Sequence, residues 1–190
     1  MMYKADHFAA VRQEIKQYDA FREKLIKKSR DVLKLSKLII YSVHRGEIPE
    51  AAKLIRTIEI ERKKLDHIAK HAAGLIFEGS YKVAVQEYVE AILYFSIVTN
   101  KKLLTARTLK VKGSYYLLGL CDVPGELVRK AVFLAGKGRT SEVTEIKDLV
   151  DYIYGELLRF DIRDNETRRK IDAVKYDLKK LEDLVLQLKK

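Results

Sequence analysis

Residues that usually interrupt or cross-link a fold are scarce in this sequence of 190 residues, which has one cysteine, two prolines, nine glycines and no tryptophan. The single cysteine, Cys121, excludes an intrachain disulfide and a cysteine-based zinc site. So few glycines and prolines supply too few turns for an all-β protein. Because Leu, Lys, Glu, Ala, Ile and Arg dominate the composition, the sequence predicts a helical protein.

Long apolar runs are missing as well. No uninterrupted apolar stretch reaches the roughly 18 residues that cross a bilayer, and residues 1–7 lack the apolar centre of a signal peptide. We therefore expect a cytoplasmic protein without membrane contacts. The length suits one domain over residues 1–190 with a sizeable core.

Negative charge is in deficit. Lys and Arg number 38 against 27 Asp and Glu, which gives a net charge of +11 and a pI near 9.5. Such an excess favours polyanionic partners, either nucleic acid or an anionic membrane, although a generally lysine-rich surface is the plainer explanation.

The basic excess is concentrated between Glu90 and Asp122, where no acid occurs. This segment carries five basic residues and then two tyrosines: Lys101, Lys102, Arg107, Lys110, Lys112, Tyr115 and Tyr116. Basic groups neutralise phosphates and aromatic rings stack on bases, so the combination suits single-stranded nucleic acid. A solvated loop followed by two core tyrosines fits the pattern equally well.

Apolar residues recur at spacings of three, four and seven over residues 3–45, which contain no Gly or Pro. This pattern predicts one very long amphipathic helix that needs neighbours or other subunits to cover its apolar stripe. A second helix is expected from Pro49 to about Phe77, and a third after Gly79 with Ser80 as its N-cap.

The second half of the chain predicts further helices. Pro124 either kinks a helix that begins near Tyr115 or stands early in a helix that Asp122 caps. Gly136 and Gly138 end that helix, Thr140 or Ser141 caps the next, and the last helix begins near Asn165. We therefore expect an all-α, single-domain bundle of six or seven helices.

Two pairs of carboxylates interrupt the most apolar segments. Glu87 and Glu90 are i and i+3, and Asp122 and Glu126 are i and i+4, so each pair shares one helical face. Acids on an apolar helix are costly unless a cation, a partner or a proton compensates them, whereas acids on a solvent-facing side would simply be hydrated.

The four carboxylates would form a site of oxygen ligands if their two segments pack together. Oxygen ligands suit Mg²⁺ or Mn²⁺, and such a metal can activate water and stabilise charge on a scissile phosphate. A di-iron centre requires Glu-x-x-His pairs, and none of the four histidines stands at that spacing.

Short blocks along nearly the whole chain occur in the order typical of one family: Ser29-Arg30-Asp31-Val32, Ile40-Tyr41-Ser42-Val43-His44-Arg45-Gly46, Gln86-Glu87-Tyr88-Val89-Glu90-Ala91, Tyr116-Leu117-Leu118-Gly119-Leu120, Gly125-Glu126-Leu127-Val128-Arg129, Arg168-Arg169-Lys170-Ile171-Asp172 and Lys175-Tyr176-Asp177-Leu178-Lys179. Together they resemble the translin/Trax family of helical nucleic-acid-binding proteins. The resemblance implies the translin-like fold and a barrel-like octamer that encloses RNA, built here from identical subunits or with a second subunit type.

The resemblance also separates two branches. Translin binds single-stranded RNA and DNA without an acidic cluster, whereas translin-associated factor X (Trax) carries the acids and is the catalytic subunit of a Mg²⁺-dependent endoribonuclease. The segments 86–91 and 122–127 resemble the two acidic motifs of Trax. This implies that Glu87, Glu90 and Asp122 are catalytic, metal-binding residues and that Glu126 is a further metal ligand. The short ends, which lack an obvious nuclear-targeting tail, imply a stand-alone protein of the prokaryotic type.

We therefore predict a Mg²⁺-dependent endoribonuclease, with Mn²⁺ as an alternative metal, that cleaves single-stranded RNA inside a homo-oligomer. Single-stranded DNA is a further candidate ligand. The alternatives are a non-catalytic nucleic-acid-binding protein of the translin type and a helical scaffold with no nucleic-acid role. Seven residues are candidates for RNA binding: Arg30, Lys37, His44, Arg45, Lys112, Arg129 and Arg168.

Overall fold

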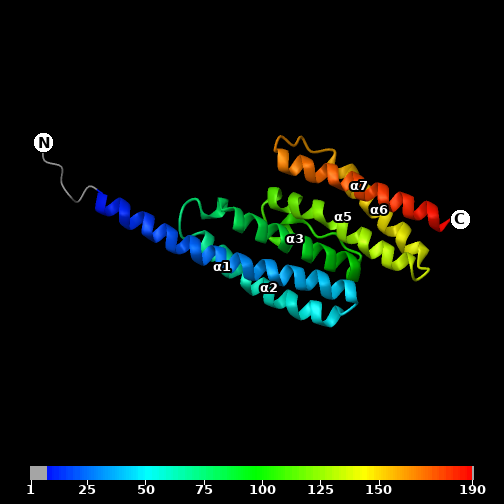
Figure 1. Cartoon of the computed structure of the whole chain (residues 1–190), viewed down its shortest axis with the longest axis horizontal. Helices are drawn as coiled ribbons and strands as arrows, with labels where there is room; N and C mark the ends of the chain where they lie inside the picture. Colours follow the sequence, from blue (N-terminus) through cyan, green and yellow to red (C-terminus); the bar gives the residue numbers. More distant parts are fainter. Residues whose placement is uncertain (1–7, 190) are drawn as a thin grey trace.

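The computed structural model describes residues 8–189, in which the regular structure is entirely helical (Figure 1). This confirms the all-α prediction with seven α-helices in the described residues, while residues 3–7 of the first expected helix lie outside them. The elements are α1 (Ala9–Arg45), α2 (Ile48–Ala69), the 3₁₀ helix η2 (Leu75–Phe77), α3 (Gly79–Asn100), α4 (Ala106–Leu109), α5 (Gly113–Ala135), α6 (Thr140–Leu157) and α7 (Asn165–Leu188).

The long helices form three layers, with α1 and α2 on one side, α3 and α5 in the middle, and α6 and α7 on the other side (Figure 1). Helix α3 packs against α1, α2 and α5, so it is buried around most of its circumference. Two contacts show that its partner α5 runs parallel to it: Tyr81 packs edge-on against Tyr115, and further along both helices Gln86 bonds to Asp122. The segment 101–112 returns the chain to the start of α5.

Helices α3 and α5 approach most closely at Gly119. A Cβ atom on this residue would lie 2.6 Å from the carbonyl oxygen of Gln86 and 2.7 Å from the Cβ of Val89. Such distances are far inside van der Waals contact, so only glycine permits this approach. The close packing sets the distance between the α3 and α5 carboxylates.

The expected second helix is too long, because α2 ends at Ala69 rather than near Phe77. Gly74 has a φ of +97° there, a left-handed conformation that glycine adopts readily, and the chain continues as η2. Leu75 is still fully buried. The apolar spacing therefore overestimated the length of α2, because a turn can direct apolar side chains into the core as a helix does.

Three expected helix caps are wrong. Glu78 rather than Ser80 precedes the first residue of α3, and Arg139 precedes α6, which already includes Thr140. Asp122 caps no helix, because it lies inside α5, which continues through Pro124. This agrees with the alternative prediction of one longer helix. The Asp122 side chain makes tertiary contacts instead, which spacing along one helix does not reveal.

The N-terminal part of α1 projects beyond the other helices (Figure 1). All of its residues from 9 to 17 are exposed, including the apolar side chains of Val11 and Ile15. Among the described residues, no helix combines the length and the apolar character that crossing a membrane requires.

Candidate active site

The acidic pairs of α3 and α5 lie in one electrostatic cluster. Burial and the negative charges of Asp122, Glu87 and Glu126 together raise the pKa of Glu90 to about 8. Charges affect one another this strongly only when they are close and partly shielded from water. The parallel packing of α3 and α5 therefore brings Glu87, Glu90, Asp122 and Glu126 together.

Glu90 is the most buried of the four, with only 8% of its surface exposed. Burial is the largest cause of its raised pKa, and the three neighbouring acids add to it. Burial also raises the pKa of the Glu87 carboxyl, an effect that nearby Lys37 of α1 opposes. At neutral pH the Glu90 carboxyl therefore mostly keeps its proton, which limits the negative charge that accumulates in the site.

Asp122 is held from two sides. Gln86 of α3 donates a hydrogen bond from Nε2 to Asp122 Oδ2 at 2.7 Å, and the ammonium of Lys170 on α7 lies 2.5 Å from Oδ1. These contacts fix the carboxylate at the junction of three helices. Since Lys170 already neutralises one charge, this lysine is part of the site.

Glu126 belongs to a second chain of contacts that reaches α1. His44 Nε2 lies 2.5 Å from Glu126 Oε2, and the hydroxyl of Tyr94 lies 3.1 Å from His44 Nδ1. A neutral imidazole satisfies both contacts if Nε2 donates to the carboxylate and Nδ1 accepts from the tyrosine. The histidine is therefore a bridge between the carboxylate and a buried tyrosine.

The donor set fits a hard divalent cation. Carboxylate oxygens are what Mg²⁺ and Mn²⁺ prefer, and a cation would relieve the repulsion that raises the pKa of Glu87 and Glu90. Within residues 8–189, no three His, Cys, Asp or Glu side chains already surround one point as metal ligands do. Asp122 and Glu126 turn toward Lys170 and His44, so metal binding would require side-chain rearrangement.

Three of the seven residues predicted to bind RNA lie around this cluster. Lys37 lies near Glu87, His44 contacts Glu126, and Arg129 lies near Tyr94. Lys37 also lines a shallow groove of about 470 Å³ on α1, together with Arg30.

Besides Arg30 in this groove, the remaining three predicted residues lie apart from the cluster. Arg45 pairs with Glu47, and Arg168 donates to the backbone carbonyl of Ile162. Lys112 precedes Asp122 by ten residues, about 15 Å along a helix, and stands at the start of α5.

Sequence reasoning missed the supporting residues Gln86, Tyr94 and Lys170. Gln86 had one signal, since it is the only polar residue besides the two glutamates and the tyrosines between Val83 and Phe95. Lys170 appeared only as part of the block Arg168-Arg169-Lys170-Ile171-Asp172. Its pairing with Asp122 spans 48 positions, which local spacing does not predict.

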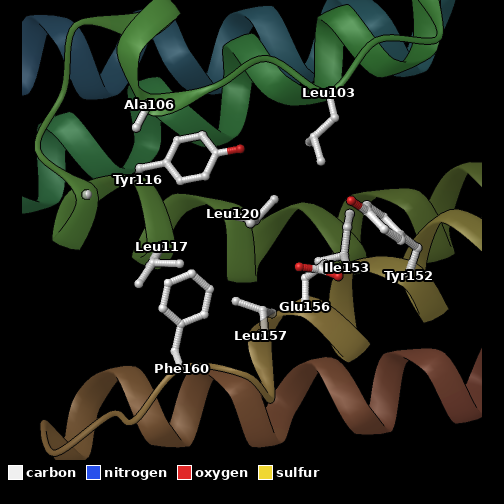
Figure 2. A pocket seen from close by; sticks show the side chains of 11 residues that line it. Leu103, Ala106, Tyr116, Leu117, Leu120, Tyr152, Ile153, Glu156, Leu157 and Phe160 are labelled. Atoms are coloured by element: carbon white, nitrogen blue, oxygen red, sulfur yellow. The ribbon is translucent and has the colours of Figure 1, made fainter.

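An apolar cavity of about 340 Å³ between the 103–106 segment, α5 and α6 is unsuited to the same chemistry (Figure 2). Glu156 is the one charged residue in its lining, which otherwise consists of aliphatic and aromatic side chains such as Leu120, Tyr152 and Phe160. Cys121 is equally inert, because burial raises the pKa of its thiol to about 12. The acidic cluster is therefore the candidate active site.

Comparison with known proteins gives consistent matches. The chain matches the model of the Translin family over residues 20–189. It is 29% identical over 167 residues to an uncharacterized protein of Methanocaldococcus jannaschii, covering 85% of this chain and 73% of that protein. It is 27% identical to the translin-associated protein X homolog of Schizosaccharomyces pombe, with coverage of 79% and 70%. It is 23% identical to translin-associated protein X of Rattus norvegicus, with coverage of 96% and 77%.

Two solved structures share the fold. Apo-NeC3PO matches with a TM-score of 0.90 and 23% identity over 98% of this chain and all of that chain (100%). AfC3PO in a complex with duplex RNA matches with a TM-score of 0.87 and 21% identity over 96% of both chains.

Proposed function

Because this chain belongs to the Translin family, we propose that it is a metal-dependent endoribonuclease that hydrolyses phosphodiester bonds of single-stranded RNA. The observation that carries the proposal is the cluster of four carboxylates from α3 and α5, in which Glu90 is buried and its pKa is raised to about 8. Perturbed acids of this kind gather at functional sites. The names of relatives and the RNA complex of a structural neighbour support the same class.

The catalytic residues in this proposal are Glu87, Glu90 and Asp122, and the metal ligands are these three with Glu126. The metal is Mg²⁺, with Mn²⁺ as the alternative. When bound, it supplies an activated water and stabilises negative charge on the phosphate.

The chain itself supplies orientation and positive charge. Gln86 holds Asp122 in place through its amide, while Glu90 must lose its proton before it can act as a carboxylate. His44 orients Glu126 through the contact between its Nε2 and Glu126 Oε2. Lys170 and Lys37 supply positive charge beside the cluster, where an RNA phosphate would lie.

A second candidate function is supported by the ion pair between Lys170 and Asp122. The lysine takes a place that a metal would otherwise take, so the cluster could be a structural element of a non-catalytic protein that binds single-stranded RNA or DNA. The basic residues Arg30, Lys37, Arg45, Lys112, Arg129 and Arg168 serve phosphate binding in both functions, together with His44.

We further propose that the protein works as a homo-oligomer, in the octameric form that the resemblance implies. The exposed apolar side chains of Val11 and Ile15 on the projecting part of α1 support this assembly, because the other described residues leave them uncovered.

Cleavage of labelled single-stranded RNA with Mg²⁺, with Mn²⁺ and with chelator tests the enzyme. We expect metal-dependent cleavage that falls at least about a hundredfold in Glu90→Gln and in Asp122→Asn, because such residues stabilise the transition state. Glu145→Gln and Asp151→Asn, two exposed acids on α6, should cleave normally.

The same assay separates the two functions. RNA binding without cleavage under any metal would support the non-catalytic protein, whereas undiminished cleavage in the double variant Glu90→Gln, Asp122→Asn would refute the site. Parallel reactions with duplex RNA and single-stranded DNA establish which nucleic acid is a substrate.

A further inference from the structure

A charged cavity of about 210 Å³ lies at the start of α3, away from the four carboxylates of the acidic cluster. The end of α2, η2, the start of α3 and the segment that leads into α5 surround it; its lining comprises Arg62, Asp66, Ala69, Lys70, Ile76, Tyr81, Lys110, Val111, Lys112 and Tyr115. Tyr81, near the start of α3, bonds to Asp66 of α2 and packs against Tyr115 of α5, whereas Glu87 and Glu90 lie six and nine residues further along α3. None of the four cluster carboxylates lines the cavity.

Arg62 is the innermost charge of this cavity and is only 7% exposed. Its Nη1 pairs with Asp66, and its guanidinium carbon lies 6.0 Å and 5.5 Å from the ring centroids of Tyr81 and Tyr88. Its Nε is buried and has no hydrogen-bond partner among the described residues. A buried donor without an acceptor is unfavourable, so the Arg62 guanidinium keeps unused hydrogen-bonding capacity beside the cavity.

Three lysines extend the positive charge from Arg62 to the mouth of the cavity. Lys70, Lys110 and Lys112 are exposed, and none of them has an ion-pair partner in the described part of the chain. Against these four cations the lining has one acid, Asp66, which already bonds to Arg62 and to the hydroxyl of Tyr81. The cavity therefore carries a net positive charge.

The backbone adds a further attraction for an anion. Lys112 is the N-cap residue of α5, a helix of 23 residues, and no side chain caps the free N–H groups of its first turn. Those N–H groups and the helix dipole favour a negative charge beside them. Lys110 has a φ of +54°, and this left-handed turn brings Lys110 and Lys112 to the same cavity.

We propose that this cavity is a phosphate-binding site that takes the phosphate group of a small nucleotide or of an RNA 5′ end. A phosphate presents several acceptor oxygens to the guanidinium of Arg62, to the lysines and to the α5 amides, and cavities of this size exceed the roughly 30 Å³ share of one water. Phe77 is 78% exposed beside Lys112, whose Nζ lies 5.8 Å from its ring centroid, so it offers a face on which an attached base stacks. Phosphate binding at this site does not require the acidic cluster, although Lys112 is also one of the residues proposed to bind RNA.

Titration calorimetry of the full chain with inorganic phosphate, at constant ionic strength in chloride buffer, tests the site directly. We expect saturable binding of one phosphate per chain, weakened at least about tenfold in the double variant Lys110→Gln, Lys112→Gln. The matched control is Lys63→Gln, Lys102→Gln, which removes the same two charges from exposed positions outside the cavity. Its binding should equal that of the unaltered protein.

Two further comparisons of ligands identify the source of the phosphate. Adenosine 5′-monophosphate is compared with adenosine, and a short RNA with a 5′-phosphate is compared with the same RNA with a 5′-hydroxyl. A preference for the phosphorylated RNA that the Lys110→Gln, Lys112→Gln variant loses assigns the site to RNA ends, and a preference confined to the mononucleotide assigns it to free nucleotides. Absence of phosphate binding, or equal weakening in both double variants, overturns the proposal.

These outcomes are separate from those of the cleavage assay. Glu90→Gln leaves the cavity intact and should bind phosphate normally. A protein that binds phosphate but cleaves no RNA would retain this site while losing the proposed enzymatic function.

Discussion

Glu90 sets the electrostatics of the candidate active site at the scale of single residues. Its carboxyl is 8% exposed and faces three other acids, which explains why its pKa rises to about 8. Sequence spacing predicted that Glu87 and Glu90 would share a face, because i and i+3 positions do so in any helix. Spacing did not predict which of the two would be buried, since that depends on the side from which α5 approaches.

The charge on Glu90 should make the metal-free protein less stable as the pH rises. An acid whose pKa is higher in the folded state binds its proton more tightly there, so folding gains stability below the unfolded pKa of about 4.5 and loses it as the pH rises through about 8. We expect Glu90→Gln to raise stability by about 1–3 kcal/mol at pH 8, because one pKa unit corresponds to about 1.4 kcal/mol.

Thermal unfolding in chelator at pH 5 and at pH 8 measures this effect. A gain of 1 kcal/mol should raise the Tm of a chain of this length by about 2–4 °C, and the gain should shrink at pH 5. Added Mg²⁺ should stabilise the unaltered protein more than Glu90→Gln. Equal Tm values for both proteins at pH 8 would contradict the buried, uncompensated charge.

The packing of α3 against α5 is what assembles the site at the scale of elements. Gly119 lets these helices meet so closely that Gln86 reaches Asp122. The sequence indicated both helices from their apolar character, and Pro124 left two alternatives open. Only the structure showed that α5 passes through Pro124 and that Asp122 contacts α3 and α7 instead of capping a helix.

Gly119→Ala should therefore separate α3 from α5. The new Cβ would meet backbone and a branched side chain at under 3 Å, so a helix must shift, at a cost of about 1–3 kcal/mol. We expect a lower Tm and reduced RNA cleavage, because the Gln86–Asp122 hydrogen bond would lengthen.

Gly155→Ala is the matched control for this substitution. Gly155 lies in helix α6, and an added Cβ would have no neighbour within 4 Å. Replacing an exposed helical glycine by alanine stabilises a helix by about 0.5–1 kcal/mol. The two variants should thus shift Tm in opposite directions. An increase of Tm in both variants would show that the contact between α3 and α5 accommodates an added methyl group.

At the scale of the whole molecule, the two main features are the projecting part of α1 and the net positive charge. Residues 9–17 lie beyond the three layers of helices (Figure 1), and the whole chain carries a net charge of +11. Apolar side chains that are exposed on a projecting helix favour burial against another subunit. This part of α1 therefore suits assembly with further copies of the chain.

Val11→Glu together with Ile15→Glu should dissociate such an assembly. Two buried charges at a subunit contact would remain uncompensated, so sedimentation velocity should report a smaller species than the unaltered protein forms. Gln13→Glu with Gln17→Glu adds the same charge at the same spacing on another exposed side of α1 and should keep the assembly. Dissociation in both variants would indicate simple charge repulsion instead of a contact through Val11 and Ile15.

The sequence by itself determined the helical class, the positions of the long helices and the pairing of acids on each of two helical faces. These properties depend on residues three or four positions apart, so periodicity is enough to predict them. The ends of α2, α3 and α6 were less predictable, because turns and core contacts override the local signals of apolar spacing and capping.

The tertiary structure alone decided that the two acidic faces meet, that Lys170 and His44 bond to Asp122 and Glu126, and that Arg62 lies buried beneath three lysines. Each of these contacts joins elements that are far apart in the chain, such as His44 and Glu126, which are 82 positions apart. Their geometry depends on how closely whole helices pack, which Gly119 and its neighbours control through steric contact.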